Sequence, residues 1–429
     1  MALVMEQRSL VADDGERFSI LLGRQSEQPL APAQPLFRPN VFLIAMRRSA
    51  GLASNSLLRD GQALMHGLVW ADQQRIDLEA RFARGEFLTP REIQRFARAA
   101  KVSFKDLSAA PPLKSPPRKI TSTDNVEQFR APSARSESGV KPETSSFKIW
   151  LFRQYVDWLA DDTARSPASQ SYRTARATEK QAMLAAFDAQ ITKFSGTTSG
   201  PREGITEAEQ SLLLEVIQPG SGSNPWVHPF VQVRNQLLIE LLLDEGIRKG
   251  ESLKQRINNI NFTDNTIDIS RRPDDPSDPR VREPNVKRAG RVLPMGDHLS
   301  NLLSDYIVNW RSKLKNARSH DILFVNKDGE PLSGESVQKM FSVLRRRHPQ
   351  LPKDLAAHLL RHTWNDNFTI TMDKNRVSAE HEMRDRSYLM GWKPSSTTAA
   401  RYTARSRRMI ATKHSLQTQE ARHRKKQDE

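Results

Sequence analysis

The chain has 429 residues, no cysteine and a formal net charge of +16. The absence of cysteine excludes disulfides, thiolate catalysis and cysteine-based zinc sites, while the basic charge favours a polyanion such as nucleic acid as partner. No segment approaches the roughly 18 apolar residues that a membrane-spanning helix needs. The first 24 residues lack the basic start and apolar centre of a signal peptide. We therefore expect a cytoplasmic, nucleoid-associated protein with no membrane partner.

The first part of the chain is predicted to be a helical domain, residues 35–195. It is preceded by an N-terminal segment, residues 1–34, to which the sequence assigns no role, although residues 17–22 are strand-like. Leucines recur at helical spacing in residues 56–73. A second helix is predicted to open at Thr89-Pro90-Arg91-Glu92, which has the pattern of a capping box with proline at the first helical position.

Proline and serine clusters divide this first part. Residues 111–146 are polar and have no hydrophobic periodicity, which predicts a flexible stretch within the domain. Residues 147–194 carry an apolar face of aromatic and aliphatic side chains and are predicted to be helical. Residues 196–203 contain glycine, serine and threonine and are predicted to link this domain to the next.

The second domain is predicted to cover residues 204–409. It opens with another capping box, formed by Thr206 and Glu209, and a long apolar helix is expected over residues 231–244. Short strand patterns at 266–270 and 291–295 predict a hairpin around a loop that is rich in proline and charge.

The last predicted helix of this domain starts near Lys353. It carries His358, Arg361 and His362 on one face, because their offsets of three and four correspond to one helical turn. Residues 373–384 are expected to form a surface loop. Residues 410–429 form a basic C-terminal tail.

The residue types near the end of the chain suit attack on a phosphodiester. The pentacoordinate transition state gathers negative charge on the non-bridging oxygens, and guanidinium groups such as those of Arg248 and Arg361 donate paired hydrogen bonds to such oxygens. A tyrosine hydroxyl such as that of Tyr402 has an ordinary pKa of about 10 and needs help to lose its proton. His358 could accept that proton or donate to a phosphate oxygen.

The pattern of Arg248 with Glu251, His358-x-x-Arg361-His362 and the late Tyr402 resembles the signature of the tyrosine recombinase (phage integrase) family. The resemblance covers residues 200–410 well and earlier residues more loosely. It implies a mainly α fold with a small β-sheet, in which a helical DNA-clamp domain precedes an α+β catalytic domain.

The family resemblance also implies roles for individual residues. Tyr402 would be the nucleophile, Arg248 and Arg361 would bind the phosphate, and His358 would assist them. Lys287, near the second strand of the hairpin, would protonate the leaving 5′-oxygen, with Lys254 as a weaker rival. Trp392 follows a glycine in the position where the family has histidine or tryptophan. Glu251 and His362 would support the site.

The implied activity is site-specific DNA recombination through a 3′-phosphotyrosyl intermediate, for a mobile element, without metal, ATP or another cofactor. The implied partners are double-stranded DNA with inverted-repeat core sites and further copies of the chain, which would form a tetramer on DNA. An accessory DNA-bending protein or a second recombinase could take part. Residues 410–417 would dock on a neighbouring subunit.

Other interpretations remain open at the level of sequence. A type IB topoisomerase or a telomere resolvase would use the same residues for another outcome, and a catalytically silent DNA-binding accessory protein would keep only the basic surface. Tyr388 is a rival nucleophile. His358 and His362 could bind zinc, but the glutamate of the metalloprotease motif is replaced by Leu359 and the sequence shows no third ligand.

Overall fold

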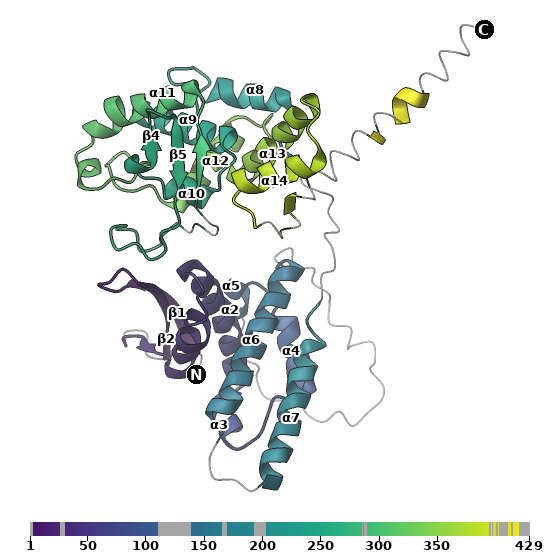
Figure 1. Ribbon diagram of the computed structural model, residues 1–429. Helices are drawn as coiled ribbons and strands as arrows, with labels where there is room; N and C mark the ends of the chain where they lie inside the picture. The colour runs from purple at the N-terminus through teal and green to yellow at the C-terminus, as the bar shows by residue number, and fades with distance from the viewer. Residues whose placement is uncertain are drawn as a thin grey trace. The chain divides into compact units, whose positions relative to one another are not determined.

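The computed structural model describes residues 3–25, 31–109, 139–164, 170–192, 203–284, 286, 290–393, 396, 398–399, 402, 411–412 and 415–419. The chain divides into two compact units, Met1–Thr197 and Thr198–Glu429 (Figure 1). Each unit is mainly helical, has its own hydrophobic core and contains a small antiparallel sheet. The predicted fold class, mainly α with a small β-sheet, is therefore confirmed. No described helix is both long enough and apolar enough to cross a membrane.

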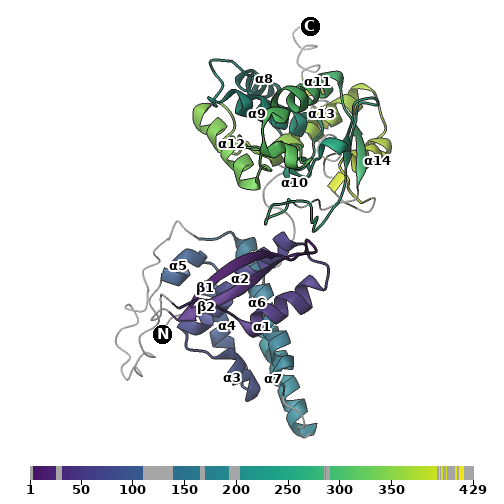
Figure 2. The same cartoon turned by 90° about the vertical axis from the view of Figure 1, so that its left-hand side faces the viewer.

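The N-terminal segment, to which the sequence assigned no role, belongs to the core of the first unit. β1 (Leu3–Val11) and β2 (Arg17–Gln25) form an antiparallel hairpin, and β3 (Gln34–Pro35) pairs with β2. Figure 2 shows this hairpin lying against α2 (Ser54–Gln73). Leu21 on β2 is fully buried, because the alternation of a strand turns it towards the helices.

Helices make up the rest of the first unit. After β3 the order is α1 (Phe37–Val41), the π-helix η1 (Phe42–Arg48), α2, α3 (Leu78–Ala83), α4 (Pro90–Ala99), α5 (Phe104–Ala109), α6 (Pro142–Asp162) and α7 (Gln170–Asp188). The core is aromatic: the rings of Phe96 and Phe152 lie 4.6 Å apart, and Trp70 packs against both. Such ring pairs stabilise a core beyond the area that they bury.

The predicted capping box at the start of α4 is confirmed, since Thr89 and Glu92 bond to each other's backbone N–H groups. The predicted flexible stretch ends earlier than expected. α6 begins at Pro142 rather than after residue 146, because proline suits the first helical position and Glu143 interacts favourably with the helix dipole. Residues 111–138 of that stretch lie outside the described residues.

The second unit is built around the buried helix α9 (Pro229–Asp244). Almost every side chain from Phe230 to Leu243 is buried, including the polar side chains of Arg234, Asn235, Gln236 and Glu240. α8 (Glu207–Val216) precedes it and starts with the predicted capping box of Thr206 and Glu209. The remaining elements are α10 (Lys249–Leu253), η3 (Ile257–Asn259), β4 (Ile260–Asn261), β5 (Thr266–Ile269), β6 (Arg291–Pro294), α11 (Asp297–Asp305), η4 (Tyr306–Trp310), η5 (Arg311–Lys313), η6 (Asn316–Ser319), α12 (Gly334–Arg347), α13 (Ala357–Lys374) and α14 (Ala379–Leu389).

The predicted hairpin of the second unit is confirmed. β5 and β6 pair antiparallel with Ile267 opposite Leu293, and both side chains are buried. β4 pairs with the other edge of β5. The register turns the apolar side chains of both strands towards the core, as the alternating pattern requires.

The expectation of a surface loop at residues 373–384 is wrong. α13 continues to Lys374, and α14 begins at Ala379 after a short connection. Ser378 caps α14 by accepting a hydrogen bond from the backbone N–H of His381, and Glu380 and Glu382 lie in its first turn, where the helix dipole favours acidic side chains. α13 also begins at Ala357, later than the predicted start near Lys353, because a turn that ends at Leu355 precedes it.

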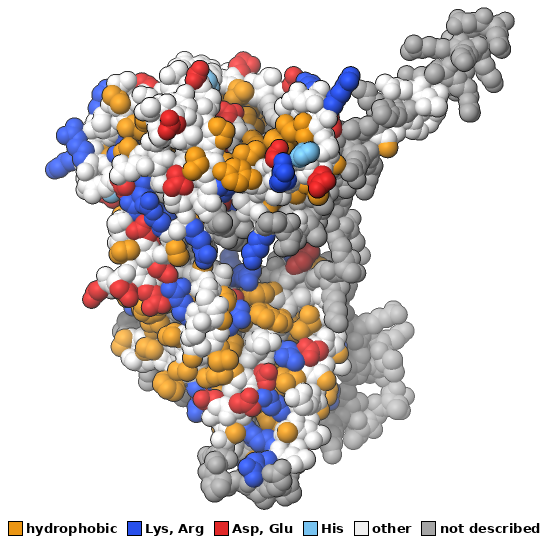
Figure 3. Space-filling view, in the orientation of Figure 1, with side chains coloured by type: hydrophobic (Ala, Val, Ile, Leu, Met, Phe, Trp, Pro, Cys, Tyr) orange, Lys and Arg blue, Asp and Glu red, His pale blue; other side chains and the backbone are white. Residues whose placement is uncertain are grey.

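The surface agrees with the basic composition. On the face shown in Figure 3, charged side chains of both signs are interspersed with apolar ones, and Lys and Arg side chains occur on both units. Scattered apolar side chains are normal on protein surfaces.

Candidate active site

A glycine turn positions the first arginine of the motif. α9 ends at Asp244, and Gly246 follows with φ +58°, a backbone conformation that side chains with a Cβ rarely adopt. A Cβ at Gly246 would also lie 2.6 Å from Cγ of Trp364 on α13. The turn therefore requires glycine, and it places Arg248 at the residue preceding α10.

Arg248 is held by a buried carboxylate. Its guanidinium donates to Glu251 Oε1 at 2.8 Å, and its backbone N–H donates to Glu251 Oε2 at 2.9 Å. Arg291 on β6 donates to the same carboxylate at 3.0 Å. Burial alone would raise the pKa of Glu251, but the charges of Arg291 and Arg248 and their hydrogen bonds lower it overall. These contacts favour the ionised form of Glu251 and orient Arg248, while the supporting role of Glu251 in catalysis stays a prediction.

Arg361 connects three parts of the second unit. It projects from α13, donates to the carbonyl oxygen of Gly246 at 2.6 Å and to that of Met390 at 3.0 Å, and is 4% exposed. Burial and the neighbouring charge of Arg248 lower the pKa of Arg361 to about 9. Because the two guanidinium charges repel each other, binding of an anion that compensates both is favoured.

The two histidines of α13 and Tyr402 form a connected chain of polar groups. The Tyr402 hydroxyl lies 2.7 Å from His362 Nδ1, and His362 Nε2 lies 3.1 Å from His358 Nε2. His358 is exposed and His362 is half-buried. The sequence named His358 as the group that could accept the tyrosine proton, but in the structure His362 is the histidine in contact with Tyr402.

Trp392 packs against the candidate nucleophile. Its ring stacks on that of Tyr402 with centroids 5.7 Å apart and an interplanar angle of 12°. The Arg361 guanidinium lies 5.6 Å from the Trp392 ring centroid. Trp392 therefore packs against one face of the Tyr402 ring.

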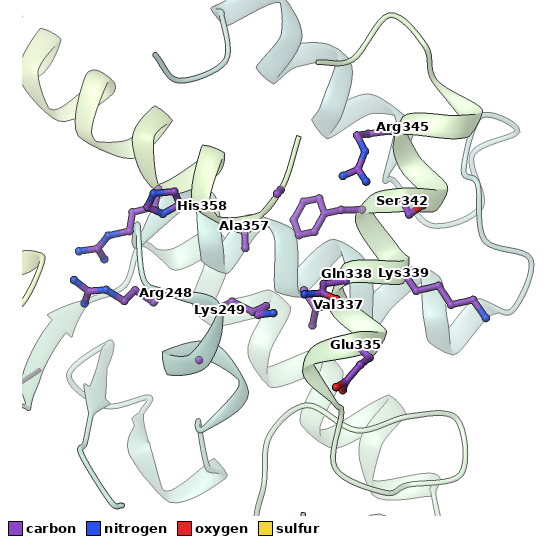
Figure 4. Close-up of a pocket in the computed structure, with 14 residues that line it drawn as sticks. Arg248, Lys249, Glu335, Val337, Gln338, Lys339, Ser342, Arg345, Ala357 and His358 are labelled. Atoms are coloured by element: carbon purple, nitrogen blue, oxygen red, sulfur yellow. The ribbon is translucent and has the colours of Figure 1, made fainter. Parts of the chain in front are cut away.

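A pocket of about 940 Å³ borders these residues. Figure 4 shows Arg248, just before α10, and His358 on α13 next to each other at one end of the pocket, and side chains of α12 on the opposite side. Most of its charged lining is basic: Arg248, Lys249, Lys339, Arg345 and Arg361 face one acidic residue, Glu335. A pocket with this charge suits an extended polyanion better than a small neutral ligand.

The predicted catalytic lysine, Lys287, lies outside the described residues. Its rival, Lys254, is 8% exposed and surrounded by acidic groups. It bonds to Glu283 and lies 3.9 Å from Asp275 and 3.8 Å from Asp278. These three carboxylates belong to the loop between β5 and β6, so Lys254 anchors the loop that carries Lys287 instead of facing the pocket.

The two candidate nucleophiles, Tyr402 and Tyr388, have different surroundings. Tyr388 is 59% exposed, and its hydroxyl donates to the backbone oxygen of Val292 at 3.4 Å. The Tyr402 hydroxyl, by contrast, lies 2.7 Å from Nδ1 of His362 on α13. Within the described part of the chain, no group of three or more His, Asp or Glu side chains is placed to hold a metal ion.

Sequence reasoning missed two buried arginines of this region. Arg291 and Leu293 lie on the same, buried side of β6, because side chains alternate along a strand. A charged residue at such a buried position indicates a buried carboxylate partner, which here is Glu251. Arg386 stands four residues after Glu382, and this spacing predicts an ion pair on a helix. The sequence pattern gave no sign that this pair is buried.

Comparisons with known proteins agree with the geometry. Residues 228–408 match the family model described as the phage integrase family. Two relatives named tyrosine recombinase XerD, from Halalkalibacterium halodurans and Corynebacterium glutamicum, are 28% and 27% identical over 36% of this chain, and the matches cover 46% and 44% of those proteins. Transposase A from transposon Tn554 of Staphylococcus aureus is 30% identical over 30% of this chain and 34% of its own length. The chain thus matches less than half the length of each of these relatives.

The fold comparison extends beyond the matched segment. The Tn1549 transposon integrase, solved in complex with transposon right end DNA, superposes with a TM-score of 0.51 over 88% of this chain and 99% of that chain, at 16% identity. At this identity the likeness concerns the fold alone. The segment that matches the family carries Arg248, Arg361 and Tyr402, which the sequence had singled out. Residues 228–408 of this chain thus match the phage integrase family.

Proposed function

We propose that this protein is a site-specific DNA recombinase that cuts and rejoins DNA strands through a 3′-phosphotyrosyl intermediate, with Tyr402 as the nucleophile. One observation carries the proposal: the Tyr402 hydroxyl is hydrogen-bonded to His362. The helix that bears this histidine also bears Arg361, and the pocket beside it contains Arg248. Nucleophile, proton acceptor and two cations are thus gathered in one place.

The two arginines would stabilise the transition state. Arg248 is oriented by Glu251, and Arg361 is held by the carbonyl oxygens of Gly246 and Met390. Because these contacts exist before DNA binds, the cations need little rearrangement to meet the charge that develops on the non-bridging oxygens. His358, which is exposed and lines the pocket, would donate a further hydrogen bond to the phosphate.

The chemical step would be a transesterification. The Tyr402 oxygen bonds to phosphorus, the bond from phosphorus to the 5′-oxygen breaks, and the tyrosine proton passes to His362 Nδ1. By resemblance to the family, Lys287 protonates the leaving 5′-oxygen. His362 can accept at Nδ1 only if its other nitrogen carries the proton, which then points to His358 Nε2. The phosphotyrosyl ester conserves the bond energy, so the rejoining step needs no ATP.

The His362→Ala variant tests the proton acceptor. We expect single-turnover cleavage to slow by about 10²-fold, the usual contribution of a positioned acid or base. The change should affect the rate of adduct formation and leave DNA binding nearly unchanged. The matched control is His381→Ala, an exposed histidine on α14, which should cleave at the parental rate. Equal rates for His362→Ala and the parent protein would remove His362 from the mechanism.

The proposal as a whole is tested by trapping the covalent adduct. Duplex fragments that flank the coding region are incubated with the protein in EDTA, denatured and separated by gel electrophoresis, and the adducts are sequenced. We expect protein-linked DNA with undiminished yield in EDTA, because the arginines supply the charge that a metal would otherwise provide. Relaxation of supercoiled plasmids without any specific site would indicate a topoisomerase instead, and closed hairpin products a resolvase. Tight binding without any adduct would indicate an accessory protein.

The proposal includes a mobile element as the biological setting and a tetramer on DNA with inverted-repeat core sites. The similarity to a transposase and the fold shared with a transposon integrase support the setting. An accessory bending protein or a second recombinase belongs to the same proposal. Of residues 410–417, expected to dock on a neighbouring subunit, 411–412 and 415–417 are described and helical, and the others lie outside the described residues.

A further inference from the structure

Arg386 is a buried cation that the recombination chemistry described above does not use. It projects from α14 and is 0% exposed. It donates to the backbone and side-chain oxygens of Asn365 at 2.7 and 3.1 Å, to Thr369 Oγ1 at 2.5 Å and to the carboxylate of Glu382. Its Nε is buried and has no hydrogen-bond partner. Burying a charge without satisfying all of its donors is costly, so a compensating role is expected.

The Arg386 guanidinium lies against the candidate nucleophile. Its central carbon is 5.5 Å from the ring centroid of Tyr402, within the range of a cation–π contact. It is also 4.9 Å from the ring of Phe368. Trp392 stacks on the tyrosine ring as well. The Tyr402 ring therefore packs against Trp392 and against the buried positive charge of Arg386.

Several other charged or titratable groups surround this tyrosine. His362 and Arg361 on α13 contact or face it, and Glu382 and Asp366 interact electrostatically with Arg386. Burial lowers the pKa of Arg386, while its hydrogen bond to Glu382 acts in the opposite direction. The attraction of a cation to an aromatic ring grows when the ring becomes a phenolate, because the negative charge lies on the ring system. Glu382 opposes this effect through its own negative charge.

We propose that Arg386 is a positioning residue that seats the ring of Tyr402 and favours its phenolate form, with Glu382 setting the strength of that effect. The inference rests on the proposed function, since it takes Tyr402 as the nucleophile. The competing role for Arg386 is purely structural: its bonds to Asn365 and Thr369 fasten α14 to α13. The two roles differ in one measurable property, the pH at which Tyr402 ionises.

That pH can be measured without DNA. The five tyrosines are labelled with ¹³C at Cζ, and the Tyr402 resonance is assigned from its absence in Tyr402→Phe. Titration then gives the midpoint of phenolate formation in the parent protein and in three variants. Arg386→Met removes the positive charge beside the ring, and Glu382→Gln removes the negative charge that opposes it. Arg384→Met is the control, an arginine-to-methionine change at an exposed position of the same helix.

The variants should move the midpoint in opposite directions. We expect it to rise by about one pH unit or more in Arg386→Met, to fall in Glu382→Gln and to stay unchanged in Arg384→Met, as is usual for charges within a few ångströms. An unchanged midpoint in folded Arg386→Met, or shifts of the same sign in both variants, would overturn the proposal. If Arg386→Met does not fold, the Glu382→Gln variant is decisive. A lower midpoint of phenolate formation in Glu382→Gln supports the proposal, and an unchanged or higher midpoint overturns it. Because no DNA is present, failure of the recombinase proposal would appear only in the adduct assay.

Discussion

Replacing Tyr402 with phenylalanine is expected to abolish covalent attachment to DNA completely, because no other oxygen at this position can attack the phosphate. The substitution removes one hydroxyl and keeps the ring that stacks on Trp392, so the fold and DNA binding should be retained. The loss should therefore be absolute for the chemical step and negligible for affinity. Denaturing gels of the trapping reaction measure the adduct, and gel-shift titrations measure binding.

The matched control for this experiment is Tyr388→Phe. Tyr388 is exposed, its hydroxyl bonds only weakly to a backbone oxygen, and its loss should leave adduct formation at the parental level. A covalent adduct that persists in Tyr402→Phe and disappears in Tyr388→Phe would transfer the nucleophile to Tyr388. An adduct that persists in both variants would refute nucleophilic attack by either tyrosine.

Replacing Arg361 with lysine is expected to slow cleavage by about 10² to 10³-fold, the cost of removing one preorganised donor to a developing oxyanion. Because lysine keeps the positive charge, the slower cleavage would measure the contribution of the guanidinium's hydrogen-bond geometry. The Arg361 guanidinium donates hydrogen bonds to the carbonyl oxygens of Gly246 and Met390. Because the group is planar and has several donors, it can keep these bonds while it also binds a phosphate. A lysine ammonium is a point charge and cannot reproduce that arrangement. Single-turnover cleavage measures the effect.

Part of any loss could come from the fold, because Arg361 joins α13 to the Gly246 turn and to the end of α14. Thermal unfolding of the same variant separates the two contributions. Arg347→Lys, an exposed arginine at the end of α12, is the matched control and should behave like the parent protein. If Arg361→Lys cleaves at the parental rate, Arg361 does not stabilise the transition state.

Local signals in the sequence were sufficient for many elements of the fold. Both capping boxes, at Thr89 and Thr206, start helices where they were expected, since the two hydrogen bonds of a capping box involve residues only three positions apart. The hairpin of β5 and β6 was predicted from alternation alone. The sequence did not predict β1, the first strand of the N-terminal hairpin, and it predicted a loop where α14 begins. Neither segment has a strong apolar periodicity of its own.

The candidate site, like the fold, was only partly predictable from local sequence signals. The sequence determined which residue types are present and in what order: Arg248 after a glycine turn, two histidines and Arg361 on one helix, and a late tyrosine. Spacing along a helix is a local property, so the proximity of His358, Arg361 and His362 followed from their numbers. The segment that matches the phage integrase family contains all of these residues.

Only the tertiary structure decided which groups meet. It paired Tyr402 with His362 rather than His358, buried Lys254 among the carboxylates of the loop between β5 and β6, and placed Arg386 beneath the tyrosine ring. These contacts join residues far apart in the chain, and their charges take effect only where burial removes water from between them. Burial and long-range contact are properties of the packed unit, so the composition and spacing of the sequence could not reveal them.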